Sequence, residues 1–154
     1  MLTVIAHDLG WLETVGCGRS FLDDAVTAVL VDTAHTPDVS EELYSDISGD
    51  ECTDADYSQQ LITGKCVAYN VDDEIRACHD KINFAADAPG GTGTIAGRYA
   101  YYVYGSPGLL MPSSRILFHI DLTGDGNAQS ENGEFSITPN AEGLYTMTKP
   151  EPEP

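Results

Sequence analysis

Short stretches of alternating apolar and polar residues, separated by turns rich in glycine, proline and acidic residues, dominate this sequence and limit how it can fold. In residues 115–122 every second position is apolar, namely Ile116, Phe118, Ile120 and Leu122. This alternation is typical of a β-strand with one face in the core. Residues 98–104 are rich in tyrosine and give the strongest strand signal, because aromatic residues favour strands. The repeated short strands predict an all-β fold, either a sandwich or a barrel, and we expect a β-sandwich with a jelly-roll-like layout.

The other elements follow from similar patterns along the 154 residues. The nearly continuous apolar run 25–31 predicts a strand buried on both faces. Ile5, Leu9 and Leu12 fall on one face of a short helix at 3–15. Shorter strands are expected at 44–47, 57–62, 65–69, 75–78, 82–84, 135–137 and 144–147, with loops at 86–94 and 105–113. We expect a helical N-terminal arm at 1–20, a sandwich domain at 21–148 and a Pro/Glu tail at 149–154.

The charge of the chain limits its partners. Seven Lys and Arg residues face 25 Asp and Glu residues, which gives a formal net charge of −18. Such a surface repels phosphate backbones and anionic lipid headgroups, so we expect neither nucleic acid nor a membrane as a partner. The acidity serves either ordinary solubility or display in a crowded or salty setting. The N-terminus lacks the basic start and apolar segment of a secretory signal, so we expect synthesis in a cytoplasm.

The four cysteines contain no C-x-x-C pair, so a structural zinc site has weak support. Two of them suggest a specific geometry. If residues 65–78 form a hairpin centred on Asp72, Cys66 and Cys78 lie directly opposite each other. Opposed strand residues hold their Cβ atoms about 4.5–5.5 Å apart, close to the range that a disulfide needs. Cys66 and Cys78 are therefore a disulfide candidate, and no such argument places the other two cysteines.

No arrangement of residues predicts catalysis. The sequence lacks the G-x-S-x-G and H-E-x-x-H motifs, and the glycine-rich stretch 90–94 has no following Lys to hold a phosphate. Residues 121–127 resemble a calcium loop, with Asp121 and Asp125 at positions 1 and 5 of that pattern. However, Asn132 stands where a bidentate Glu is expected, so a plain connection between strands is favoured and Ca²⁺ is a weak alternative. We expect a protein that is not an enzyme and needs no cofactor.

The tyrosine-rich strand suggests a contact surface. Tyr99 and Tyr101 share one face of it, and Tyr102 and Tyr104 share the other. If only one face lines the core, the other presents large amphipathic rings, which suit a protein interface. The alternative is a central strand that its own domain covers on both sides. The interface hypothesis names Tyr101, Tyr102, Tyr104 and His119.

Residues 28–147 resemble a group of small β-rich virion structural proteins of tailed bacteriophages. The resemblance lies in short motifs that occur in the same order: AVLVDTAHTP at 28–37, YSDI at 44–47, GKCVAY at 64–69, AGRYA at 96–100 and GEFSI at 133–137, followed by Gly143. The four cysteines, the strong acidity and the Pro/Glu tail depart from the pattern of that group.

The resemblance implies a structural role in a phage-like particle. It favours a capsid decoration or stabilising protein that binds the major capsid protein or other virion proteins and forms a homo-oligomer. Such a protein is assembled in the host cytoplasm and lies on the outer surface of the head. A neck or tail adaptor of the same particle is one alternative, and a calcium-binding β module that uses residues 121–127 is another. These expectations rest on likeness, because a fold alone does not fix a function.

Overall fold

The computed structural model describes residues 3–6, 20–38, 40–69, 74–84, 94–123, 128–131, 135–139 and 145–148. Within these residues the chain is mostly β, its sheets are antiparallel, and helix is nearly absent. The alternating stretches therefore predicted the fold class correctly at the level of an antiparallel, all-β architecture.

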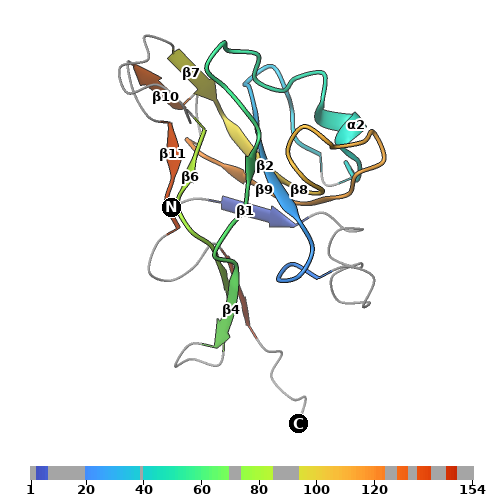
Figure 1. Cartoon of the computed structure of the whole chain (residues 1–154), viewed down its shortest axis with the longest axis vertical. Coiled ribbons are helices and arrows are strands. Elements are labelled where there is room, and N and C mark those ends of the chain that lie inside the picture. The colour runs from blue at the N-terminus through green and yellow to red at the C-terminus, as the bar shows by residue number, and fades with distance from the viewer. Residues whose placement is uncertain are drawn as a thin grey trace.

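The main sheet runs in the order β1-β9-β8-β2-β3 (Figure 1). Its strands are β1 (Thr3–Ala6), β9 (Ile116–Asp121), β8 (Tyr99–Tyr104), β2 (Val26–Val31) and β3 (Gln60–Leu61). Each strand is antiparallel to its neighbours. The three predicted strands with the clearest patterns, β2, β8 and β9, are confirmed, and they form the middle of this sheet.

Three smaller antiparallel sheets accompany the main one. β10 (Ala128–Glu131) pairs with β7 (Thr94–Gly97), and β11 (Ser136–Ile137) pairs with β6 (Ile82–Asn83). The third sheet has the order β12-β5-β4, formed by β12 (Tyr145–Thr148), β5 (Glu74–Cys78) and β4 (Cys66–Tyr69). The hairpin of β4 and β5 was predicted, whereas β7 and β10 were not.

The core lies on both faces of the main sheet, because every side chain of β2 and β8 is buried. Residues that alternate along a strand point to opposite faces. Leu30 and Tyr102 therefore belong to one hydrophobic cluster, which includes residues of β6, β7 and β11. Val29 and Tyr101 belong to the second cluster, which Ile47 of the short helix α2 (Tyr44–Ile47) joins on the other face. The burial of β2 on both faces confirms the prediction made from its unbroken apolar run.

Two local predictions are wrong. Residues 3–6 form strand β1 along the edge of β9, not the start of a helical arm, which agrees with the β-branched residues Thr3, Val4 and Ile5. The rest of the predicted helix lies outside the described residues, as does the tail 149–154. Residues 44–47 were expected to be a strand, and they form helix α2.

The N-terminus of α2 shows why this segment turns. The Asp46 carboxylate accepts hydrogen bonds from the backbone N–H groups of Glu42 and Leu43, both at 3.0 Å. These N–H groups precede the first turn of the helix and have no acceptor within it, so the Asp46 side chain supplies one. The Tyr44 N–H donates to the Ser114 carbonyl at 2.8 Å, which fixes the helix against the end of a loop.

Candidate functional site

The four side chains predicted as an interface lie inside the folded chain. Their exposed fractions are 0% for Tyr101, 0% for Tyr102, 2% for Tyr104 and 1% for His119. β8 lies between β2 and β9, and both of its faces are covered by hydrophobic clusters. The structure therefore corrects the interface hypothesis and shows the alternative, a central strand covered on both sides by its own domain.

The hydroxyl of Tyr101 belongs to a polar cluster of four residues, which we call the His35 cluster: His35, Glu41, Asp50 and Tyr101. His35 Nδ1 lies 2.9 Å from Asp50 Oδ2. His35 Nε2 lies 2.9 Å from the Tyr101 hydroxyl and 3.0 Å from Glu41 Oε1. The Tyr101 hydroxyl donates to Glu41 Oε2 at 2.9 Å. The imidazole ring thus lies between the carboxylates of Glu41 and Asp50, with one nitrogen toward each.

The His35 cluster contains groups used in acid–base catalysis, but its geometry is that of a structural link. General acid–base catalysis needs a ring nitrogen within reach of a substrate. Both nitrogens of His35 contact groups of this chain, and its side chain is 5% exposed. The cluster instead joins the segment that contains Glu41 and Asp50 to the central strand β8.

A second polar cluster surrounds the carboxylate of Glu51. Tyr57 donates to Glu51 Oε1 at 2.8 Å, and Tyr44 donates to Oε2 at 2.5 Å. Gln59 Nε2 donates to the same carboxylate at 3.0 Å. Burial and then the nearby Glu51 raise the pKa of Tyr44 to about 12. Burial, with Glu51 as the next cause, also raises the pKa of Tyr57.

These tyrosines predict a loss of stability at alkaline pH. The pKa of Tyr44 is 10.0 in an unfolded chain and about 12 in the folded one, so the unfolded state releases its proton first. The free energy of unfolding should therefore fall as the pH rises from about 10 to about 12. Denaturant titrations across this range would measure the fall, and Tyr44→Phe should reduce it. An equal fall in Tyr44→Phe would contradict the assignment to Tyr44.

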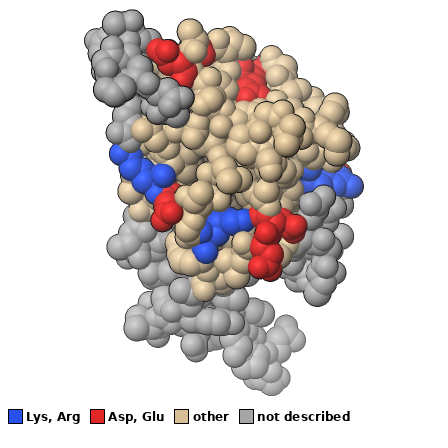
Figure 2. Space-filling view, in the orientation of Figure 1, with Lys and Arg blue, Asp and Glu red and all other residues tan. Residues whose placement is uncertain are grey.

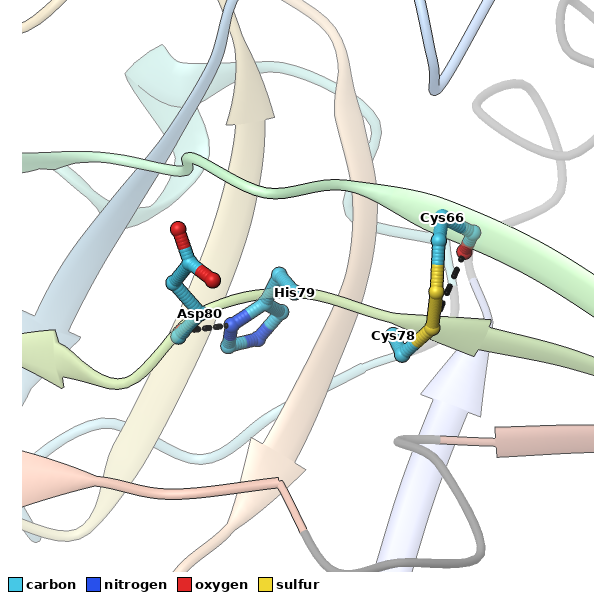
Figure 3. Close-up of a disulfide and its surroundings, with 4 residues drawn as sticks. All are labelled: Cys66, Cys78, His79 and Asp80. Atoms are coloured by element: carbon cyan, nitrogen blue, oxygen red, sulfur yellow. Dashed lines mark hydrogen bonds between the residues drawn. A yellow bond between two sulfur atoms is a disulfide. The ribbon is translucent and has the colours of Figure 1, made fainter.

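His79 is a further buried histidine. Its Nε2 lies 2.9 Å from the Tyr102 hydroxyl, and its Nδ1 contacts the Asp80 carbonyl (Figure 3). Burial lowers the pKa of His79. The neutral ring can donate through one nitrogen and accept through the other. His79 therefore links the segment after β5 to the central strand.

The predicted cysteine pair lies at the base of the β4–β5 hairpin. The register of β4 and β5 places Cys66 opposite Cys78, with 5.1 Å between their Cα atoms, and the two form a disulfide (Figure 3). This is the arrangement expected for a hairpin centred on Asp72. Among the described residues the free thiol is Cys52, which is buried, and burial raises its pKa to about 11. Cys17 lies outside the described residues.

Removal of the disulfide should destabilise the protein measurably. The bridge spans 12 residues, and a loop of this size constrains the unfolded chain by about 2–3 kcal/mol. A double variant with Cys66→Ser and Cys78→Ser should unfold at lower denaturant concentration than the wild type. A reductant should lower the midpoint of the wild type and leave that of the double variant unchanged. An unchanged wild-type midpoint would show that the disulfide adds no stability.

The structure describes only part of the weak calcium candidate. Both carboxylate oxygens of Asp121 have partners, since Oδ2 accepts from Arg98 at 3.1 Å and Oδ1 accepts from the Thr123 N–H at 3.1 Å. Asp125 and Asn132 lie outside the described residues. Across the described part of the chain, no group of three or more His, Cys, Asp or Glu side chains could hold a metal ion.

Among the residues that the structure describes, the most exposed large apolar side chains belong to a loop between β8 and β9, which we call the 106–114 loop. Leu109 is 76% exposed and Met111 is 62% exposed. The side chain between them, Leu110, packs instead against the hydrophobic cluster that contains Tyr101. Two apolar side chains thus point outward from either side of one that anchors the loop in the core.

Backbone hydrogen bonds hold the 106–114 loop in place. Within the loop, the Leu109 N–H donates to the Ser106 carbonyl at 3.1 Å, and the Met111 N–H donates to Ser114 Oγ at 3.0 Å. Gln59 Oε1 accepts from the Gly108 N–H at 2.9 Å, and the Pro112 carbonyl accepts from the first turn of α2. Gly108 has φ of 70°, a conformation that glycine adopts without steric cost.

Gly105 shows how closely the loop is packed at its start. Its φ is 136°, and a Cβ placed on it would lie 2.8 Å from Leu110 Cδ2. A side chain at this position would therefore displace the anchoring leucine. Glycine here lets Leu110 enter the core, which in turn directs Leu109 and Met111 toward solvent.

The 106–114 loop is also free of charge. Its sequence, SPGLLMPSS, contains no acidic or basic residue although the chain has a net charge of −18. Figure 2 shows a mostly uncharged surface over the region where Figure 1 places α2 and this loop. The sequence predicted a loop here but assigned it no role. The available signal was an apolar triplet, Leu109 to Met111, inside a stretch bounded by glycine and proline.

Comparisons with known proteins add no identification: no family model, no curated protein and no solved structure matches this chain. The described helices include none that is long and apolar enough to cross a membrane.

Proposed function

We propose that this chain is a non-catalytic structural protein of a tailed-phage-like particle, a capsid decoration or stabilising protein that binds the major capsid shell. The observation that carries the proposal is the fixed, uncharged loop that presents Leu109 and Met111 on an acidic protein. Exposed apolar side chains in a fixed position are typical of a contact site. The acidic remainder of the surface would keep many displayed copies soluble.

Two further observations support this proposal. The described residues that often act in catalysis, such as His35 and His79, are buried and bonded to groups of the chain itself. The Cys66–Cys78 disulfide suits a protein that ends in an oxidising environment, as the outside of a released particle would be. The proposal of a phage-like particle rests on the motifs in residues 28–147 that resemble those of small phage virion proteins.

The proposal includes the finer fold expected from the sequence, a β-sandwich with a jelly-roll-like layout. Its support is the hydrophobic cluster between the main sheet and the smaller sheets, which joins Leu30 and Tyr102 to Ile82, Ile95 and Ile137. Two layers of antiparallel sheet that share one core are the defining feature of a sandwich.

Purified particles of the phage that encodes the chain would test this function. Quantitative mass spectrometry and an electron-microscopy map should place many copies on the outer face of the head. A single ring at the neck would favour the adaptor alternative. If the purified particles lack the protein altogether, the structural role is wrong.

A further inference from the structure

We propose that the 106–114 loop is the docking element of this chain and that it inserts Leu109 and Met111 into an apolar socket bordered by basic side chains on a partner protein. This inference rests on the proposed structural function, and it specifies the chemistry of the surface that the chain binds.

The loop is held in one conformation by its own chain before any partner binds. Leu110 packs against the hydrophobic cluster that contains Tyr101, and hydrogen bonds fix the residues on either side of it. The Leu109 and Met111 side chains do not pack against the chain's own surface, since they are 76% and 62% exposed. A preorganised loop loses little conformational entropy when it binds, which favours insertion over induced ordering.

Charged side chains lie beside the loop. The Pro112 carbonyl accepts a hydrogen bond of 3.1 Å from the Ser45 N–H in the first turn of α2. The same turn carries Asp46, which is exposed and whose pKa is lowered by the backbone N–H of Leu43. Glu42 lies on the other side of this turn and pairs with Arg115 at 3.7 Å. The border of the apolar tip thus includes a stable negative charge, and complementary surfaces place positive charge opposite it.

The charge of the chain favours a different protein over a second copy as the partner. Two copies that each carry a net charge of −18 repel one another. The chain has only seven Lys and Arg residues to offset this. Among those the structure describes, Arg98 pairs with Asp121, Arg115 pairs with Glu42, and the Lys65 ammonium donates to the Asp24 carbonyl. An acidic surface is likewise repelled by anionic lipid headgroups. A basic protein surface satisfies both the apolar and the charged parts of the site.

Binding of the purified chain to shells assembled without it tests the inference. Leu109→Ser and Met111→Ser should each raise the Kd by about tenfold or more, because each removes a large apolar group from the contact. Val67→Thr is the matched control, because Val67 is 46% exposed on β4, which lies far from the loop (Figure 1). The Kd of this variant should equal that of the wild type. Added salt should slow association of the wild type, as expected for opposite charges around the contact.

The outcomes separate the inference from the function on which it rests. If both serine variants bind shells as tightly as the wild type, the docking role of the loop is wrong, whereas the structural function still stands. If the wild type does not bind shells at all, the structural function is overturned together with the inference. Sedimentation that shows self-association lost in Leu109→Ser assigns the loop to a second copy instead. Flotation of the wild type with zwitterionic lipid vesicles, lost in the same variant, assigns it to a lipid surface.

Discussion

Tyr102→Ala is expected to lower the free energy of unfolding by about 3–5 kcal/mol, the range for truncating a buried aromatic side chain. Tyr102 is fully buried, and its ring stacks on Phe118 with 4.3 Å between centroids. Its hydroxyl lies 2.9 Å from His79 Nε2. Alanine would leave a cavity beside Phe118 and a buried histidine nitrogen without its partner. Denaturant unfolding of the purified variant would measure the loss.

Tyr102→Phe separates the packing of the ring from the hydrogen bond of the hydroxyl. It keeps the stacked ring and removes only the contact with His79, which should cost about 1 kcal/mol. A loss as large in Tyr102→Phe as in Tyr102→Ala would assign the stability to the hydroxyl. No loss in Tyr102→Ala would contradict the placement of β8 in the core.

His35→Leu is expected to destabilise the fold by about 2–3 kcal/mol, the cost of leaving buried polar groups without their hydrogen-bond partner. Leucine removes both ring nitrogens and leaves Glu41, whose side chain is 13% exposed, without its contact to the ring. Loss of the contact to Asp50 costs less free energy, because the Asp50 side chain is 43% exposed and can be hydrated. Thermal or denaturant unfolding would measure the change.

Asp50→Asn is the matched variant for the His35 cluster. It changes the partly hydrated end of the cluster, so its loss should be smaller than that of His35→Leu, about 1 kcal/mol. The His35→Leu variant should also exchange the amide hydrogens of Tyr44 and Ser45 faster, because these bond to the 106–114 loop from the segment that the cluster holds. Unchanged stability in His35→Leu would show that the cluster does not hold that segment.

Several features could be read from the sequence because they depend on local pattern. The alternation in residues 115–122 and the tyrosine-rich run 98–104 identify β9 and β8, since period two is the signature of a strand. The spacing of Cys66 and Cys78 about Asp72 gives the register of the β4–β5 hairpin, because a turn fixes which residues face each other.

Other features could not be read because they depend on contacts between distant segments. The pattern of β8 allows either one or both faces to be buried, and only the two hydrophobic clusters packed on opposite faces of the main sheet decide for both. Residues 3–6 carry apolar residues that suit a helix or a strand, and pairing with β9 selects the strand. Residues 44–47 turn into helix α2, where Asp46 accepts from the backbone N–H groups just before the helix and the end of the 106–114 loop accepts from those of Tyr44 and Ser45.

The amino-acid order by itself determined that this protein is built from short antiparallel strands, that Cys66 and Cys78 face each other, and that its surface is acidic. These properties follow from neighbouring residues and from charge, which need no long-range contact. Only the tertiary structure decided which apolar residues are buried and which are exposed. The same kind of side chain is partly buried at Leu110 and exposed at Leu109, because one packs against the core and the other lies in solvent.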